Sequence, residues 1–277
     1  MGVTRMMLGR AALVFLLLGF ALPGPARTEP TEAERLARWA DLRHAIFGDR
    51  VVEDAGDLVA VDAPERAEDA AIVPVAIRVA ETLAPKIRGL YLVIDNNPSP
   101  LAAHFLLGPI ADAREIATRV RIDDYTYLHA VAETADGRLY AAARFIKAAG
   151  GCSAPAGKDQ ALALERLGKM KLSLTDRSRP DEPIRAKLLI SHPNSSGLQM
   201  DQVTRNYVPA DFVRSIKVTY NGAPVLTVES DISISEDPSF TFEFVPNAQS
   251  GELSAEVEDS NNRHFAHAWP VKVEPGT

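Results

Sequence analysis

Residues 72–80 read Ile-Val-Pro-Val-Ala-Ile-Arg-Val-Ala, which places a valine or isoleucine at every second position from 73 to 79. Successive side chains of a strand point to opposite faces of a sheet. This run therefore predicts a β-strand with one buried face and one solvated face. The same alternation returns far along the chain, where residues 240–244 read Phe-Thr-Phe-Glu-Phe. Both halves of the chain are predicted to be built from strands.

Further short β-rich runs, separated by turn residues, extend outward from these two. The candidate strands of the first half are Leu58–Val61, Ile72–Ala80, Ile87–Asp95, Leu101–Leu107, Arg114–Ile122, Tyr125–Glu133 and Leu139–Lys147. Those of the second half are Ile184–Ser191, Phe212–Tyr220, Val225–Ser230, Phe240–Val245, Leu253–Asp259 and His264–Val273. Asn221-Gly222 is typical of a type I′ hairpin turn. Short strands at such intervals predict two separate antiparallel β-sandwiches, a mainly β fold.

A single helix is predicted before the first strands. Thr31 and Glu34 have the spacing of a capping box, apolar residues recur at helical spacing up to Phe47, and Gly48 ends the pattern. We expect a short amphipathic helix from Glu32 to Phe47 that packs on the following domain.

The series of short β-rich runs is interrupted between residues 147 and 183. A Gly-Gly-Cys segment comes first, then a helix-like stretch over Lys158–Met170, and then the polar run 175–183. We therefore predict a first domain at 27–149 that includes the N-terminal helix, a cysteine-bearing arm and linker at 150–182, and a second domain at 183–277.

The N-terminal residues 1–26 have the layout of a secretory signal peptide. Arg5 and Arg10 precede an apolar run over 11–22, and a small-residue site follows at Gly24-Pro25-Ala26. The sequence predicts export to the periplasm and no membrane attachment after cleavage, because no other apolar run is long enough to span a bilayer. The net charge of −7 gives no electrostatic basis for binding nucleic acid.

Cys152 is the only cysteine of the chain and follows Gly150 and Gly151. An unpaired cysteine in an exported protein points to reactive chemistry or an intermolecular bond. The flanking glycines predict an exposed, mobile thiol with an accessible sulfur. The alternative is a cysteine that serves as a small buried hydrophobic residue, which is a common fate of free cysteines.

The sequence predicts no catalytic residues and no metal site or cofactor beyond a covalent sulfur adduct on Cys152. Its histidines form no cluster with the cysteine, and His264 and His267 would point to opposite faces of a strand. Zinc sites need three or four converging ligands. A nucleophile without a base or an oxyanion hole favours a carrier over an enzyme.

Several motifs resemble one family of proteins. Gly150-Gly151-Cys152 resembles the carrier arm of SoxY, the sulfur-carrying subunit of thiosulfate oxidation, and Asn97-Pro98-Ser99-Pro100-Leu101 resembles a turn in the same domain. Ile190-Ser191-His192-Pro193, Tyr207-Val208-Pro209-Ala210 and Tyr220-Asn221-Gly222 resemble the partner subunit SoxZ. The order of these motifs is similar to that of fused SoxYZ-like carrier proteins named for their association with quinoprotein dehydrogenases. The chain departs from SoxY in that Cys152 is internal and is followed by Ser153.

The resemblance implies two immunoglobulin-like sandwich domains that pack on each other, and a thiol at Cys152 that carries sulfur intermediates to periplasmic sulfur-oxidation enzymes. Two alternatives stay open. The first is an accessory or redox-linked protein of a periplasmic quinoprotein (PQQ-dependent) alcohol dehydrogenase and its cytochrome. The second is a thiol enzyme in which the fold brings a histidine to Cys152.

Overall fold

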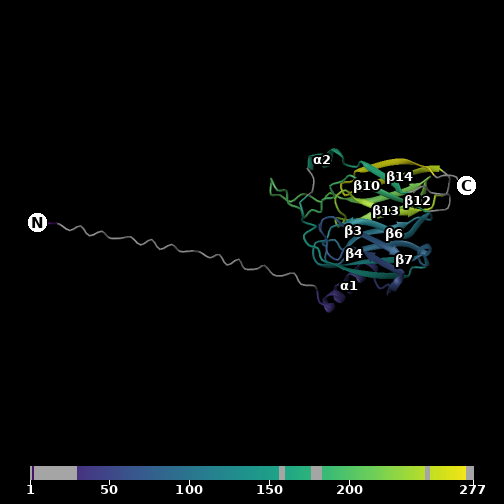
Figure 1. The fold of residues 1–277 in the computed structure, drawn as a ribbon, viewed down its shortest axis with the longest axis horizontal. Helices are drawn as coiled ribbons and strands as arrows, with labels where there is room; N and C mark the ends of the chain where they lie inside the picture. Colours follow the sequence, from purple (N-terminus) through teal and green to yellow (C-terminus); the bar gives the residue numbers. More distant parts are fainter. Residues whose placement is uncertain (1, 3–29, 156–159, 176–182, 247–249, 273–277) are drawn as a thin grey trace.

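The computed structural model describes residues 2, 30–155, 160–175, 183–246 and 250–272 of the chain. It begins with helix α1 (Glu32–Phe47), which lies against the first half of the molecule (Figure 1). The predicted capping box is present, since Thr31 and Glu34 bond each other's main-chain N–H groups, and Gly48 ends the helix. The predicted helix is therefore confirmed at both ends. The predicted signal peptide, apart from Gly2, lies outside the described residues.

The strands form two sheets. The larger sheet contains, in spatial order, β1 (Val52–Asp54), β8 (Leu139–Ile146), β7 (Thr126–Thr134), β4 (Ile87–Ile94), β5 (Leu101–Leu107), β12 (Ala223–Ser230), β11 (Val213–Tyr220), β14 (Ser250–Asp259) and β15 (His264–Lys272). The smaller sheet contains β2 (Val59–Asp62), β3 (Val73–Val79), β6 (Ala111–Val120), β13 (Ser239–Phe244), β10 (Ile184–Ile190) and β9 (Met170–Thr175). Neighbouring strands are antiparallel, except that β1 and β8 are parallel. The predicted mainly β sandwich fold is confirmed.

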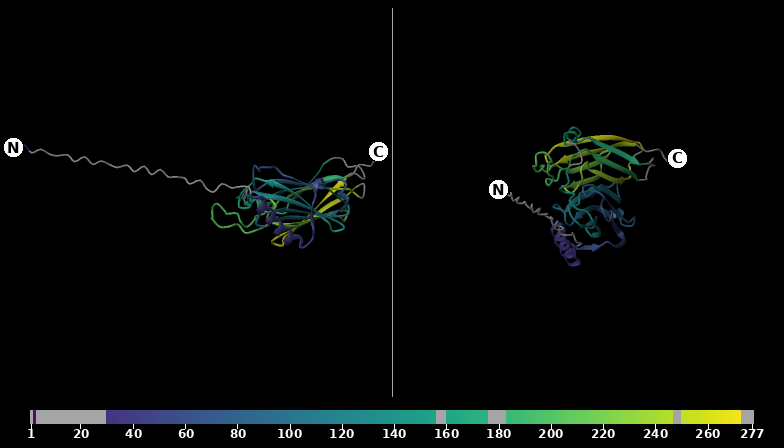
Figure 2. Two further views of the ribbon diagram at one scale, coloured as in Figure 1. Left: turned by 90° about the horizontal axis from the view of Figure 1, so that it is seen from below. Right: turned by 60° about the vertical axis from the view of Figure 1, so that its left-hand side comes forward.

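Both sheets run across the boundary between the two halves of the chain. Strand β5 of the first half pairs with β12 of the second, and β6 pairs with β13. The prediction of two separate sandwiches is thus wrong, although the two halves are distinguishable as the blue and the yellow-green parts of Figure 2. An unpaired edge strand exposes a row of N–H and C=O groups. In each sheet, each half covers one edge of the other, and the expectation that the halves pack together is met by main-chain pairing.

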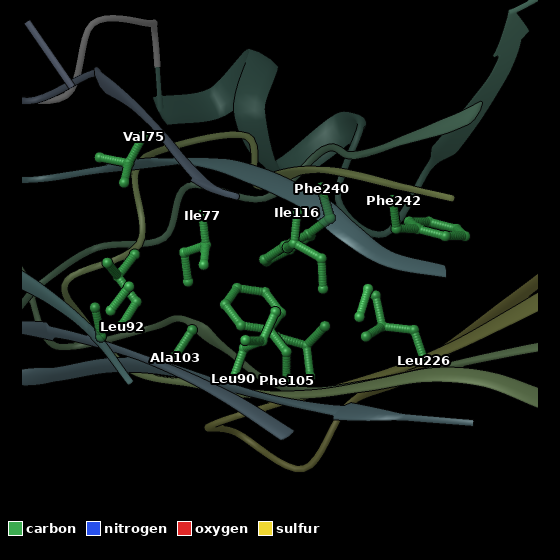
Figure 3. Close-up of a cluster of buried hydrophobic side chains, with 14 of the residues drawn as sticks. Val75, Ile77, Leu90, Leu92, Ala103, Phe105, Ile116, Leu226, Phe240 and Phe242 are labelled. Atoms are coloured by element: carbon green, nitrogen blue, oxygen red, sulfur yellow. The ribbon is translucent and has the colours of Figure 1, made fainter. Parts of the chain in front are cut away.

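One hydrophobic core lies between the sheets and contains side chains from both halves. Figure 3 shows Leu90 and Phe105 of the first half facing Phe240 of the second half across the core, with Leu226 of the second half beside them on the same sheet. The rings of Phe105 and Phe240 meet edge to face with 6.3 Å between centroids. The alternation in residues 240–244 has the predicted result, since the three phenylalanines are buried and the residues between them are half-buried.

Turns and short elements complete the fold. The Asn221-Gly222 hairpin turn is confirmed, as both residues have positive φ. Two 3₁₀ turns cover Gly56–Leu58 and Ala84–Lys86. The helix predicted over Lys158–Met170 is shorter, because α2 (Gln160–Glu165) is followed by strand β9, which the sequence analysis did not predict. No helix within the described ranges is long and apolar enough to cross a membrane.

Candidate functional site

The Gly-Gly-Cys segment packs against the first half of the molecule shortly after β8 ends. The main-chain N–H of Gly150 donates to the Asp123 carbonyl at 2.7 Å, and that of Gly151 donates to the Ile122 carbonyl at 2.8 Å. Gly150 has φ +79°, a conformation that other residues rarely adopt. These contacts turn the chain inward at Cys152.

Cys152 is fully buried, with 0% of its surface exposed. The prediction of an exposed, mobile thiol is therefore wrong, and the buried alternative describes the resting position of the side chain. Gly151 supplies the physical reason, because a Cβ atom at this residue would lie 2.0 Å from the Ala70 carbonyl oxygen. The glycine lets two main-chain segments approach closely, and this approach buries the next residue instead of freeing it.

The second half of the chain closes over the other side of the segment. Ser196 donates its hydroxyl hydrogen to the Cys152 carbonyl, and the Gln199 side-chain amide donates to the Ala154 carbonyl at 2.8 Å. Both side chains are themselves buried. The thiol consequently lies at the junction between the two halves, and the segment 150–155 is held from both sides.

Burial has a direct effect on the chemistry of the thiol. It raises the pKa of Cys152 to about 12, and the nearby Asp123 carboxylate acts in the same direction, while the Arg121 guanidinium opposes them. The thiolate is the nucleophilic form of cysteine. In the closed position Cys152 is therefore a protonated, unreactive thiol at neutral pH.

Arg121 is a charged residue that is buried at the same site as Cys152. It follows β6, is 1% exposed, and donates from Nη1 to the Gly151 carbonyl at 3.4 Å and from Nη2 to the Asn194 carbonyl at 3.2 Å. Its Nε has no hydrogen-bond partner in the described part of the chain. The sequence analysis missed this residue, because a single arginine at the end of an alternating strand gives no signal of its own.

His192 and its neighbours form a polar network behind the site. The main-chain N–H of Asn194 donates to Nδ1 of His192 at 3.0 Å, which places the imidazole proton on Nε2, facing Asp259 at 3.4 Å and Asp211 at 3.6 Å. Burial lowers the pKa of His192 and favours this neutral form. Arg263 forms ion pairs with both carboxylates. Arg263 thereby offsets part of the negative charge of the two acids, which lie with His192 in one close group of potential ligand atoms.

Two of the motifs that carried the family resemblance converge here. Asn97 donates to the Arg121 carbonyl at 2.7 Å and to the Ser233 hydroxyl at 2.9 Å, and its amide oxygen accepts the Asp123 main-chain N–H at 2.9 Å. Asn97 thereby links the two halves at Arg121 and Asp123, two of the residues that bond the cysteine segment. His192 reaches the same region through Asn194 and Arg121.

None of the described histidines forms a hydrogen bond with the thiol, and none contributes to the pKa shift of Cys152. His264 and His267 are exposed on the edge strand β15. A cavity of about 190 Å³ lies beside the segment, lined in part by Pro155, Pro193 and Gln199, but Cys152 does not line it. The arrangement provides a held thiol and a nearby cation, without a base in contact.

Comparison with known proteins gives two family matches in tandem. The family described as sulfur oxidation protein SoxY matches residues 43–152, and the family described as sulphur oxidation protein SoxZ matches residues 170–270. Among solved structures, the sulfur carrier protein SoxY from Chlorobium limicola f thiosulfatophilum is similar at 26% identity with a TM-score of 0.35, over 42% of this chain and 96% of that chain. No curated protein matches the chain. The first family match ends at Cys152, the residue on which the two halves close.

Proposed function

Because the chain is a fused SoxYZ-like protein, with a SoxY domain and a SoxZ domain in tandem, we propose that it is a non-catalytic periplasmic carrier whose Cys152 holds sulfur intermediates covalently for partner enzymes. The observation that carries the proposal is the position of Cys152 at the junction of the two domains, at the end of the SoxY match. A carrier needs a sulfur atom that can be presented and withdrawn, and no catalytic base beside it.

The carrier cycle requires the segment 150–155 to leave its closed position. Among the described residues, few hydrogen bonds hold it, namely the main-chain bonds of Gly150 and Gly151 and the side-chain bonds from Arg121, Ser196 and Gln199. Segments held by few hydrogen bonds open locally at free energies well below that of global unfolding. Opening exposes the thiol to solvent, returns its pKa to the ordinary range and allows reaction on a partner enzyme.

Loading with thiosulfate would join the Cys152 sulfur to the outer sulfur of thiosulfate. The step releases the thiol proton and passes an electron pair to a partner oxidoreductase, so that a disulfide-like S–S bond replaces the S–H bond. Closure would then shield the adduct from reductants between enzymes. An internal arm that is held at both ends can perform this cycle by local opening, without the reach of a free terminus.

The test is intact-mass analysis of protein purified from the periplasmic fraction of its native cells grown with thiosulfate, compared with Cys152→Ala from the same cells. We expect sulfur-containing mass adducts on the wild type that a reductant removes, and none on the variant. Wild type that is unmodified during active sulfur oxidation, or protein confined to the cytoplasm, would contradict the proposal. The accessory role beside a quinoprotein dehydrogenase stays a prediction of the sequence.

A further inference from the structure

Arg121 is a buried cation without a matching anion. Its side chain is 1% exposed, and no described carboxylate forms an ion pair with it. Among the described residues, its three nitrogens have only two long hydrogen bonds, both to main-chain carbonyls, and Nε has none. Asp69 and Glu236 attract it from beyond ion-pair distance.

A buried guanidinium without an opposite charge is unfavourable unless an anion binds beside it in another state of the protein. Guanidinium groups remain charged in proteins, and an unpaired buried charge is strongly destabilising. Binding two carbonyls does not require a charge, because a neutral amide would supply the same donors. The retained charge therefore points to an anion that is absent from the closed, unloaded protein.

The position of Arg121 identifies where that anion lies. Nη1 bonds the carbonyl of Gly151, immediately before Cys152, and a negative charge on Cys152 would attract the guanidinium. A charged sulfur group on Cys152 would consequently be carried close to a guanidinium whose Nε has no described partner. Arginine is well suited to oxyanions because its donors match their geometry.

Resting on the proposed carrier function, we infer that Arg121 is the counter-charge for an anionic sulfur adduct on Cys152, such as an S-thiosulfonate, in the closed site. The site thus selects negatively charged cargo, and a neutral group of similar size is held less well. Arg121 acts here as a positioning and retention residue and takes no part in forming the bond.

Two reagents load the thiol with groups of different charge. Tetrathionate reacts with the Cys152 thiol to give the S-thiosulfonate, with release of thiosulfate and a proton. Methyl methanethiosulfonate gives the neutral S-methylthio adduct, with release of methanesulfinic acid. Both reactions exchange one S–S bond for another and need no external oxidant. Each adduct is then released by dithiothreitol, at a rate that depends on how well the closed site retains it.

The experiment measures these release rates in full-length wild type, Arg121→Gln and Arg121→Lys. Arg121→Gln keeps amide donors but loses the charge, and Arg121→Lys keeps the charge. Arg119→Gln is the matched control, because Arg119 lies two residues away, is half-buried and also bonds a carbonyl, that of Asp237. Release of the anionic adduct should be at least about tenfold faster in Arg121→Gln, as expected for loss of a close opposite charge, with release of the neutral adduct much less affected.

Arg121→Lys should restore slow release of the anionic adduct, and Arg119→Gln should resemble wild type. Acceleration of both adducts by the same factor in Arg121→Gln would mean that Arg121 only supports the loop, and would overturn the inference. If Arg121→Gln does not fold, wild type decides, because the native fold must then slow release of the anionic adduct, relative to the same adduct on the denatured chain, by a larger factor than it slows release of the neutral one. The release rates could depend on adduct charge as expected while intact-mass analysis finds no sulfur adduct on protein from native cells. That pair of results would refute the carrier function and still support the anion site at Arg121.

Discussion

The hydroxyl of Ser196, in the SoxZ domain, donates its hydrogen to the main-chain carbonyl of Cys152, 44 residues earlier in the chain. This bond joins the two domains at the residue proposed to carry the cargo. Because it binds the main chain and not the sulfur, it holds the segment closed without consuming the reactive atom. The state of the domain junction and the accessibility of the thiol are consequently coupled.

Removing this bond should expose the thiol more often. In Ser196→Ala the closed segment loses one side-chain hydrogen bond, worth about 1 kcal/mol net, so native-state labelling by a maleimide should be about fivefold faster. Ser254→Ala is the matched control, since the Ser254 hydroxyl bonds Thr219 within the SoxZ domain, away from the cysteine segment. Equal labelling rates for Ser196→Ala and wild type would mean that the segment opens without breaking this bond.

The buried position of Cys152 predicts a measurable cost for replacing it. Cys152→Ser should lower the free energy of unfolding by about 1–3 kcal/mol, because it buries a hydroxyl in place of a weakly polar thiol. Ser153→Ala, next along the chain and exposed, should change it by less than about 0.5 kcal/mol. Urea unfolding of both variants provides the measurement. A Cys152→Ser variant as stable as Ser153→Ala would show that the thiol spends most of its time in solvent.

The sequence predicted the positions of most helices and strands, but it did not predict how the strands of the two halves pair. Local signals located α1, the hairpin turn at Asn221-Gly222 and nearly all strands within a few residues. The shared sheets were not predictable, because the pairing of β5 with β12 links segments more than a hundred residues apart and no local pattern records it. The same limit applied at the site. Gly151 signalled conformational freedom, whereas its actual role is a close approach to Ala70 that only the fold reveals.

The shared core predicts that the two domains unfold together. Phe240 is buried against Phe105 of the other domain, so Phe240→Ala should reduce the free energy of unfolding by about 3–5 kcal/mol. Calorimetry should give one transition for both wild type and variant, at a lower temperature in the variant. Val203→Ala is the control, because Val203 is 90% exposed in the SoxZ domain and its removal should have little effect. Two separated transitions in wild type would indicate domains that fold independently despite their common sheets.

The reactivity of Cys152 should depend on pH in a way that separates a gated thiol from a free one. Burial raises its pKa to about 12 from the ordinary 9.0. The closed segment therefore keeps its proton at pH values where the open segment loses it. The stability of the closed form relative to the open form is full below pH 9.0 and is lost as the pH rises from there toward 12.

Alkylation of the native protein by iodoacetamide should thus continue to rise with pH above 9.0, because each further unit of pH draws more of the protein into the open thiolate form. The same chain in denaturant should instead reach a plateau once its thiol is ionised. Rates measured between about pH 7 and 11, with circular dichroism to establish that the fold persists, make the comparison. A plateau near pH 9.0 in the native protein would show a thiol that is already exposed at rest, and local opening would then have no part in the carrier cycle.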